Sequence, residues 1–166
     1  MQLPKNSDEI FRVPSKKEVV FKGGDLAAVA SEVLERGAAF RFQAKGYSMW
    51  PCIINRDAVT LSAYYHRPIR IGEIIAFFGP GRGRLIVHRV LCKRGDKYLV
   101  KGDSLFWSDR LIVRDEIVGY VSYIERCGKR CTFGLNSGRV FVTVLSYLRV
   151  LYMARVTGYA IFCWLL

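Results

Sequence analysis

The sequence is poor in the residues that most often bind metals or form disulfides. It has two histidines and five cysteines in 166 residues, and an odd number of cysteines cannot all pair within one chain. Cys127 and Cys131 have three residues between them, but no second pair and no histidine lies nearby. We therefore expect no metal site and no cofactor. Free thiols are typical of proteins in a reducing compartment.

Acidic residues are also scarce, and their distribution is uneven. The chain has 26 Lys and Arg against 14 Asp and Glu, a net charge of +12, which favours an anionic partner such as nucleic acid or a lipid surface. The excess does not form a basic arm, so nucleic acid is the less favoured partner. Residues 136–166 contain three arginines and no acid. The first residues lack the apolar stretch of a secretory signal.

The pattern along the chain divides it into three segments. Residues 1–22 form a polar lead with one strand candidate at 17–21, residues 23–135 form the main domain, and residues 136–166 form an apolar C-terminal helix. Within the main domain, apolar residues recur at helical spacing over residues 25–36, after a capping Asp25 and before a terminating Gly37.

Short apolar runs separated by turn residues predict strands through most of the main domain. A content of 51% hydrophobic residues excludes a disordered chain. The strand spacing predicts a mainly β fold, a coiled antiparallel sheet or partial barrel, without βαβ alternation. The expected strands are residues 40–44, 58–61, 73–78, 84–91, 97–100 and 117–124.

The C-terminal segment has two interpretations. Residues 140–166 are apolar except for Arg149, Arg155 and a few small polar residues. They form either a helix packed on the domain or a membrane anchor that spans the bilayer or lies on it. The apolar end of the segment favours contact with a membrane surface, because large exposed apolar patches are rare.

A serine, a histidine and an aspartate occur in an order that permits nucleophilic catalysis. Ser48 lies in a turn after a strand, and His88 lies within an apolar strand. Asp103 and Asp109 follow the next strand. An imidazole can take the proton that a serine hydroxyl must lose, and a carboxylate can orient the imidazole. The alternative is a structural turn serine and a half-buried histidine.

Five short segments match one known pattern in order. They are residues 46–51 (GYSMWP), 57–60 (DAVT), 72–77 (GEIIAF), 88–90 (HRV) and 101–103 (KGD). Together they resemble the superfamily that joins type I signal peptidases to the self-cleaving SOS-type repressors. The histidine in HRV is similar to the endoplasmic-reticulum and archaeal signal peptidases, which use a Ser-His pair.

This resemblance implies roles for individual residues. Ser48 would be the nucleophile and His88 the general base, supported by Asp103 or, as the alternative, Asp109. The Ser48 backbone N–H would contribute to the oxyanion hole. Gly46, Met49 and Pro51 would shape the turn and the substrate edge of the site.

Two departures from the pattern limit what the resemblance implies. Gly46 stands at a position where signal peptidases usually have a serine. A glycine there is closer to the pattern of the repressors. No apolar span precedes residues 46–51, and the apolar segment is C-terminal. We therefore expect a membrane-associated protein whose catalytic domain is on the cytoplasmic side.

These observations predict a serine endopeptidase that cleaves a peptide or protein precursor. One alternative is a repressor-like, self-cleaving or DNA-associated regulator, although no helix-turn-helix or Ala-Gly cleavage site precedes the domain. The other is a non-catalytic, membrane-bound binding module of the same fold.

Overall fold

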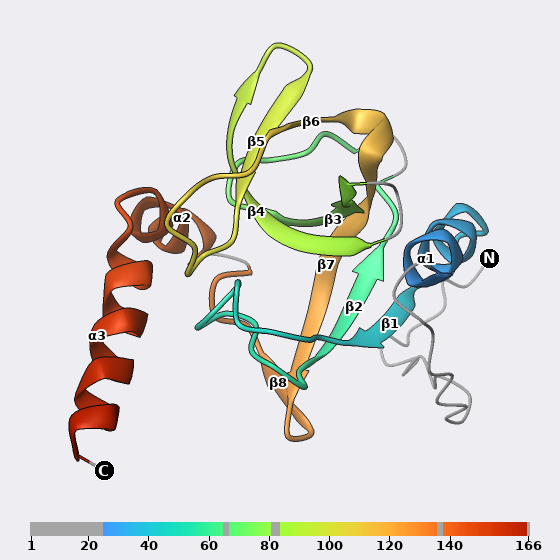
Figure 1. Ribbon diagram of the computed structural model, residues 1–166. Helices are drawn as coiled ribbons and strands as arrows, with labels where there is room; N and C mark the ends of the chain where they lie inside the picture. Colours follow the sequence, from blue (N-terminus) through green and yellow to red (C-terminus); the bar gives the residue numbers. More distant parts are fainter. Residues whose placement is uncertain (1–24, 65–66, 81–83, 136–137, 166) are drawn as a thin grey trace, which may run out of the picture.

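A curled antiparallel sheet forms the body of the computed structural model, which describes residues 25–64, 67–80, 84–135 and 138–165 (Figure 1). The strand expected at 17–21 lies outside these residues. The strands are β1 (Phe40–Gln43), β2 (Ala58–Ser62), β3 (Ile74–Phe78), β4 (Leu85–Arg94), β5 (Lys97–Lys101), β6 (Leu111–Val113), β7 (Ile117–Arg126) and β8 (Lys129–Cys131).

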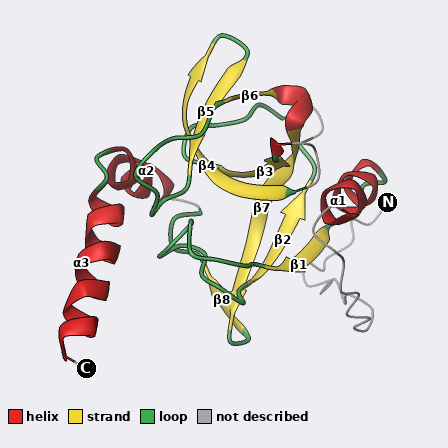
Figure 2. Cartoon of the chain, in the orientation of Figure 1, coloured by secondary structure: helices red, strands yellow, loops and turns green. Residues whose placement is uncertain are grey.

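The strands lie in the order β1-β2-β7-β3-β4-β5-β6, and β8 pairs with β7. All neighbours are antiparallel, and β7 crosses the middle of the sheet (Figure 2). A mainly β fold with a curled antiparallel sheet is therefore confirmed, and each of the six expected strands is present. Strands β6 and β8 were not expected, because three residues are too few to show an alternating pattern.

Helix α1 (Asp25–Glu35) covers one side of the sheet. Ala27, Ala30 and Leu34 are buried at helical spacing, as the apolar periodicity predicts. The chain turns away from the helix at Gly37, whose φ of 81° allows the next N–H, that of Ala38, to donate to the Val33 carbonyl at 3.2 Å.

The buried side chains form two main groups. One lies between α1 and the sheet, and the other lies inside the curl of β3 to β6. The first group includes Ala30, Leu34, Val59, Leu61, Ile74 and Ile124. The second includes Ile75, Phe77, Val90, Tyr98, Val100 and Ile112. The second group lies on the same face of β4 as His88, whose ring centre is 6.1 Å from that of Phe77.

The C-terminal segment is two helices where one was expected. Helix α2 (Arg139–Tyr147) is followed by α3 (Val150–Leu165), on the side of the molecule away from α1 (Figure 1). The axes of α2 and the first part of α3 differ by 75°, and Arg149 between them has a φ of 62°. Within the described residues, no helix alone has the length and apolar character to cross a bilayer, although these two pass that test as a bent pair.

Candidate active site

Ser48 lies in a tight turn that leaves β1 and leads toward β2. The turn starts at Gly46, whose φ of 93° favours glycine, and its N–H donates to Asn55 Oδ1 at 3.2 Å. The Trp50 N–H donates to the Tyr47 carbonyl at 3.0 Å, which closes the turn around Ser48. The sequence therefore presents Ser48 at the tip of a turn, as expected.

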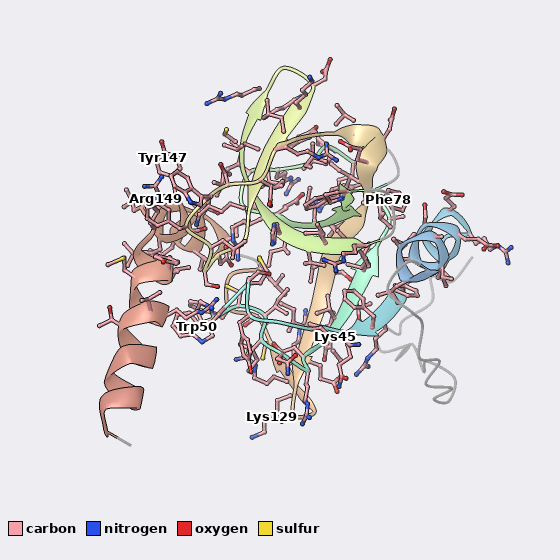
Figure 3. The ribbon with its side chains drawn as sticks, viewed as in Figure 1. Lys45, Trp50, Phe78, Lys129, Tyr147 and Arg149 are labelled. Carbon is pink, nitrogen blue, oxygen red and sulfur yellow. The ribbon has the colours of Figure 1, made fainter. Side chains whose placement is uncertain are left out.

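Met49 anchors this turn in the interior. Its side chain is 3% exposed and belongs to the core between α1 and the sheet. The prediction that Met49 shapes the turn fits this position, but its burial removes it from a substrate edge. Pro51 follows a cis peptide bond and is half-buried, and Trp50 lies between the turn and α3 (Figure 3).

His88 is fixed in the middle of β4. It is 5% exposed and pairs across the sheet with Ile75 of β3. Its Nδ1 contacts Asp109 Oδ2. Asp109 reaches this position because its N–H donates to the Val100 carbonyl of β5 at 2.9 Å, which brings the loop after β5 back alongside the sheet. Because a carboxylate accepts the hydrogen bond from Nδ1–H, the proton of the neutral ring is on Nδ1, and Nε2 is the nitrogen that can accept a proton.

The structure corrects the expectation that Asp103 supports His88. Asp103 instead accepts two hydrogen bonds from the neighbouring Arg89, from Nε and Nη2, each at 2.7 Å. Both side chains are fully buried. Burial disfavours the charge on Arg89, but Asp103 outweighs this effect and raises the pKa of the guanidinium above its ordinary value. Asp109, the alternative in the sequence analysis, is the carboxylate on His88.

Arg89 holds three further groups around this ion pair. Its Nη1 donates to the Gly72 and Gly134 carbonyls at 2.8 and 2.7 Å, and its Nη2 lies 3.3 Å from Cys52 Sγ. Burial and the Asp103 charge raise the pKa of Cys52 to about 12. Cys52 is therefore a neutral, inert thiol near neutral pH and not a competing nucleophile.

The loop that follows β5 joins the Ser48 turn to the His88 partner. At one end, the Ser104 N–H donates to the Ser48 carbonyl at 2.9 Å, and Ser104 Oγ donates to the Tyr47 carbonyl at 2.5 Å. At the other end, Asp109 contacts His88. The loop of residues 102–109 thus carries contacts to both predicted catalytic residues.

Gly102 allows this loop to approach the turn closely. A Cβ built on Gly102 would lie 2.7 Å from the Ser48 carbonyl oxygen, which is a backbone atom that cannot swing away. The glycine of the KGD segment is thus explained by a steric requirement of the Ser48 turn.

We expect Gly102→Ala to displace Ser48 and lower the rate of acylation of its hydroxyl by at least about tenfold, because small misplacements of reacting groups cost this much or more. The matched control is Gly158→Ala on α3, where an added Cβ meets nothing within 4 Å. Labelling rates with a serine-directed probe measure the effect. Equal rates for both variants would contradict the steric role of Gly102.

Two cations not anticipated from the sequence tie the C-terminal helices to this loop. Lys101 Nζ donates to the Ser146 carbonyl at 2.7 Å, at the C-terminal end of α2. Burial lowers the pKa of Lys101 against the opposing charge of Asp103, and Arg149 adds a smaller lowering effect. Arg155 Nη1 of α3 donates to Ser104 Oγ at 3.1 Å. The feature of the sequence that could have predicted the Arg155 contact is an isolated arginine in an otherwise apolar segment.

The reactive atoms of the site have no other hydrogen-bond partners in the described part of the chain. Neither Ser48 Oγ nor His88 Nε2 is hydrogen-bonded to the other or to another group among these residues. Ser48 is half-buried, and His88 is buried. The Ser48 N–H likewise has no acceptor among these residues. The Ser48 hydroxyl, the His88 Nε2 atom and the Ser48 N–H therefore have no hydrogen-bond partner within the described residues.

A scan against models of known protein families finds no match to this chain, and a search of curated proteins finds no similar sequence. The signal-peptidase resemblance therefore stays a prediction that rests on its five segments. In the described ranges, no three His, Cys, Asp or Glu side chains gather as metal ligands would.

Proposed function

We propose that this protein is a serine endopeptidase, with Ser48 as the nucleophile, His88 as the general base and Asp109 as the residue that orients His88. One observation carries the proposal. The loop that holds the Ser48 turn also places Asp109 on His88 Nδ1. Three residue types that together activate a hydroxyl are thereby linked through one segment.

In the proposed reaction, Ser48 Oγ attacks the carbonyl carbon of a peptide bond while its proton moves to His88 Nε2. The carbonyl oxygen becomes negative and accepts a hydrogen bond from the Ser48 N–H. The C–N bond then breaks, and His88 returns the proton to the leaving amine. A water molecule, deprotonated by His88, hydrolyses the Ser48 ester and releases the carboxylic acid. Asp109 accepts the Nδ1–H bond throughout and stabilises the imidazolium.

The position of β1 suggests how an extended substrate would bind. Strand β1 is at one end of the strand order, so one of its edges pairs with no strand among the described residues. The chain runs from β1 directly into the Ser48 turn. A peptide added to this edge by main-chain hydrogen bonds would pass Ser48.

Incubation of the full chain with a mixed peptide library, followed by mass spectrometry, tests this proposal. We expect the wild-type protein to produce fragments and Ser48→Ala to produce none, because the hydroxyl that attacks is absent. Ser31→Ala on α1 is the matched control and should retain cleavage, since the Ser31 hydroxyl bonds, among the described residues, only to Glu35 on the helix surface. Undiminished cleavage by Ser48→Ala would refute the proposed nucleophile.

The absent hydrogen bond between Ser48 Oγ and His88 Nε2 favours a second candidate, a binding module of the same fold without catalysis. Catalytic hydrogen bonds often form only when substrate is bound, so the two candidates differ in chemistry and not in this geometry. A binding module would retain peptides from the library intact, and Ser48→Ala would bind them as well as the wild-type protein does.

A further inference from the structure

We propose that the outer face of α2 and α3, together with Trp107, docks on an anionic phospholipid bilayer. This inference concerns a surface and is independent of the peptidase proposal. It is carried by the distribution of apolar and polar side chains on α2, the continuation of the apolar surface beyond α2, and the charge of the segment.

Helix α2 is apolar on its exposed side as well as on its buried side, unlike an ordinary surface helix. Its buried side includes Val142, Thr143 and Ser146, and Ser146 binds the ammonium group of Lys101. Its exposed side is apolar, with side chains at helical spacing: Val140, Phe141, Val144, Tyr147 and Leu148. A helix against water normally turns its apolar side inward. The exposed side of α2 is thus suited to an apolar environment.

The apolar surface continues past the bend between the helices. On α3, the exposed side chains Val150, Met153 and Val156 follow at helical spacing. At the bend, the Arg149 guanidinium lies 4.1 Å from the centre of the Phe106 ring and 5.4 Å from that of Trp107. Trp107 is 72% exposed, and Figure 3 places Tyr147 and Arg149 at this outer corner. Exposed tryptophan beside arginine is typical of a bilayer interface.

Charge identifies the kind of partner. Residues 136–166 contain Arg139, Arg149 and Arg155 and no acidic residue, and the whole chain carries a net charge of +12. A second copy of the chain would bring these like charges together. An anionic lipid surface would instead attract them and accept the apolar side chains between them.

Flotation of the full chain with vesicles tests the proposal. We expect the protein to float with phosphatidylcholine vesicles that contain phosphatidylglycerol, to float less with phosphatidylcholine alone, and to dissociate partly as salt is raised. The double variant Phe141→Gln, Val144→Gln should lower the partition coefficient at least about tenfold, since it removes two apolar side chains from the lipid.

Val113→Gln is the matched control, because Val113 is an exposed valine on β6 (37% exposed, against 49% for Val144) outside the helices. It should float as the wild-type protein does. Three results would overturn the proposal. The first is a wild-type chain that does not float, and the second is an equal loss of flotation in the double variant and in Val113→Gln. The third is a wild-type protein that binds no vesicles and is a dimer in ultracentrifugation, while the double variant is a monomer. The last result would identify a second copy as the occupant.

Discussion

Asp109→Asn is expected to lower kcat/KM for peptide cleavage by about 10²- to 10⁴-fold with little change in stability. The asparagine side chain can present an N–H to His88 Nδ1, which favours the ring tautomer with the proton on the wrong nitrogen. In Ser-His-Asp triads this change costs about 10⁴-fold in kcat. The Asp109 side chain is 30% exposed, so water can replace part of its effect, and the lower end of the range applies if it does.

The appropriate control is Asp96→Asn, an exposed aspartate in the turn between β4 and β5. It should leave both activity and thermal midpoint unchanged. If Asp109→Asn cleaves as fast as the Asp96 variant, then Asp109 does not orient a catalytic histidine, and its contact with His88 is only structural.

Asp103→Asn is expected to have the opposite profile, destabilising the fold by about 3–5 kcal/mol. The substitution leaves the Arg89 guanidinium fully buried without its counter-charge, and breaking one partner of a buried ion pair typically costs this much. For a chain of this size, the midpoint of thermal unfolding should fall by about 6–20 °C. Calorimetry or circular dichroism measures the shift.

The double variant Arg89→Met, Asp103→Leu separates a loss of charge pairing from a loss of packing. Removing both charges leaves no unpaired buried ion, so this variant should recover part of the stability lost in Asp103→Asn. The recovery is incomplete because the Gly72 and Gly134 carbonyls lose their Arg89 donor. A fall in the midpoint of thermal unfolding that is larger for Asp109→Asn than for Asp103→Asn would contradict the assignment of Asp103 to Arg89 and of Asp109 to His88.

The fold was largely predictable because local signals agree with the tertiary structure. The alternating residues of β1 and the apolar runs of β3 and β4 give strands at the expected places. The C-terminal segment was not predictable in detail. Its bend falls at Leu148 and Arg149, where no glycine or proline marks a break, and Arg149 itself adopts the left-handed conformation.

For the candidate site, the sequence indicated which residues to consider but not how the two carboxylates pair. The spacing from His88 to Asp103 and to Asp109 does not tell which carboxylate returns to the histidine. The overlooked signal was Arg89, which follows His88 in an apolar strand and must therefore have a buried counter-charge. Asp103 meets that need. Asp109 is brought to His88 by the main-chain hydrogen bond to β5.

Labelling of Ser48 with a fluorophosphonate probe tests most directly the claim that Ser48 and His88 form a catalytic pair. Only an activated hydroxyl attacks the phosphorus of the probe, and no natural substrate is required. Mass spectrometry of the digested protein should find the adduct on Ser48 in the wild-type chain, and little or none in His88→Ala at an unchanged thermal midpoint. A folded wild-type protein with unmodified Ser48, or a His88→Ala variant labelled equally fast, would contradict a Ser48–His88 catalytic pair.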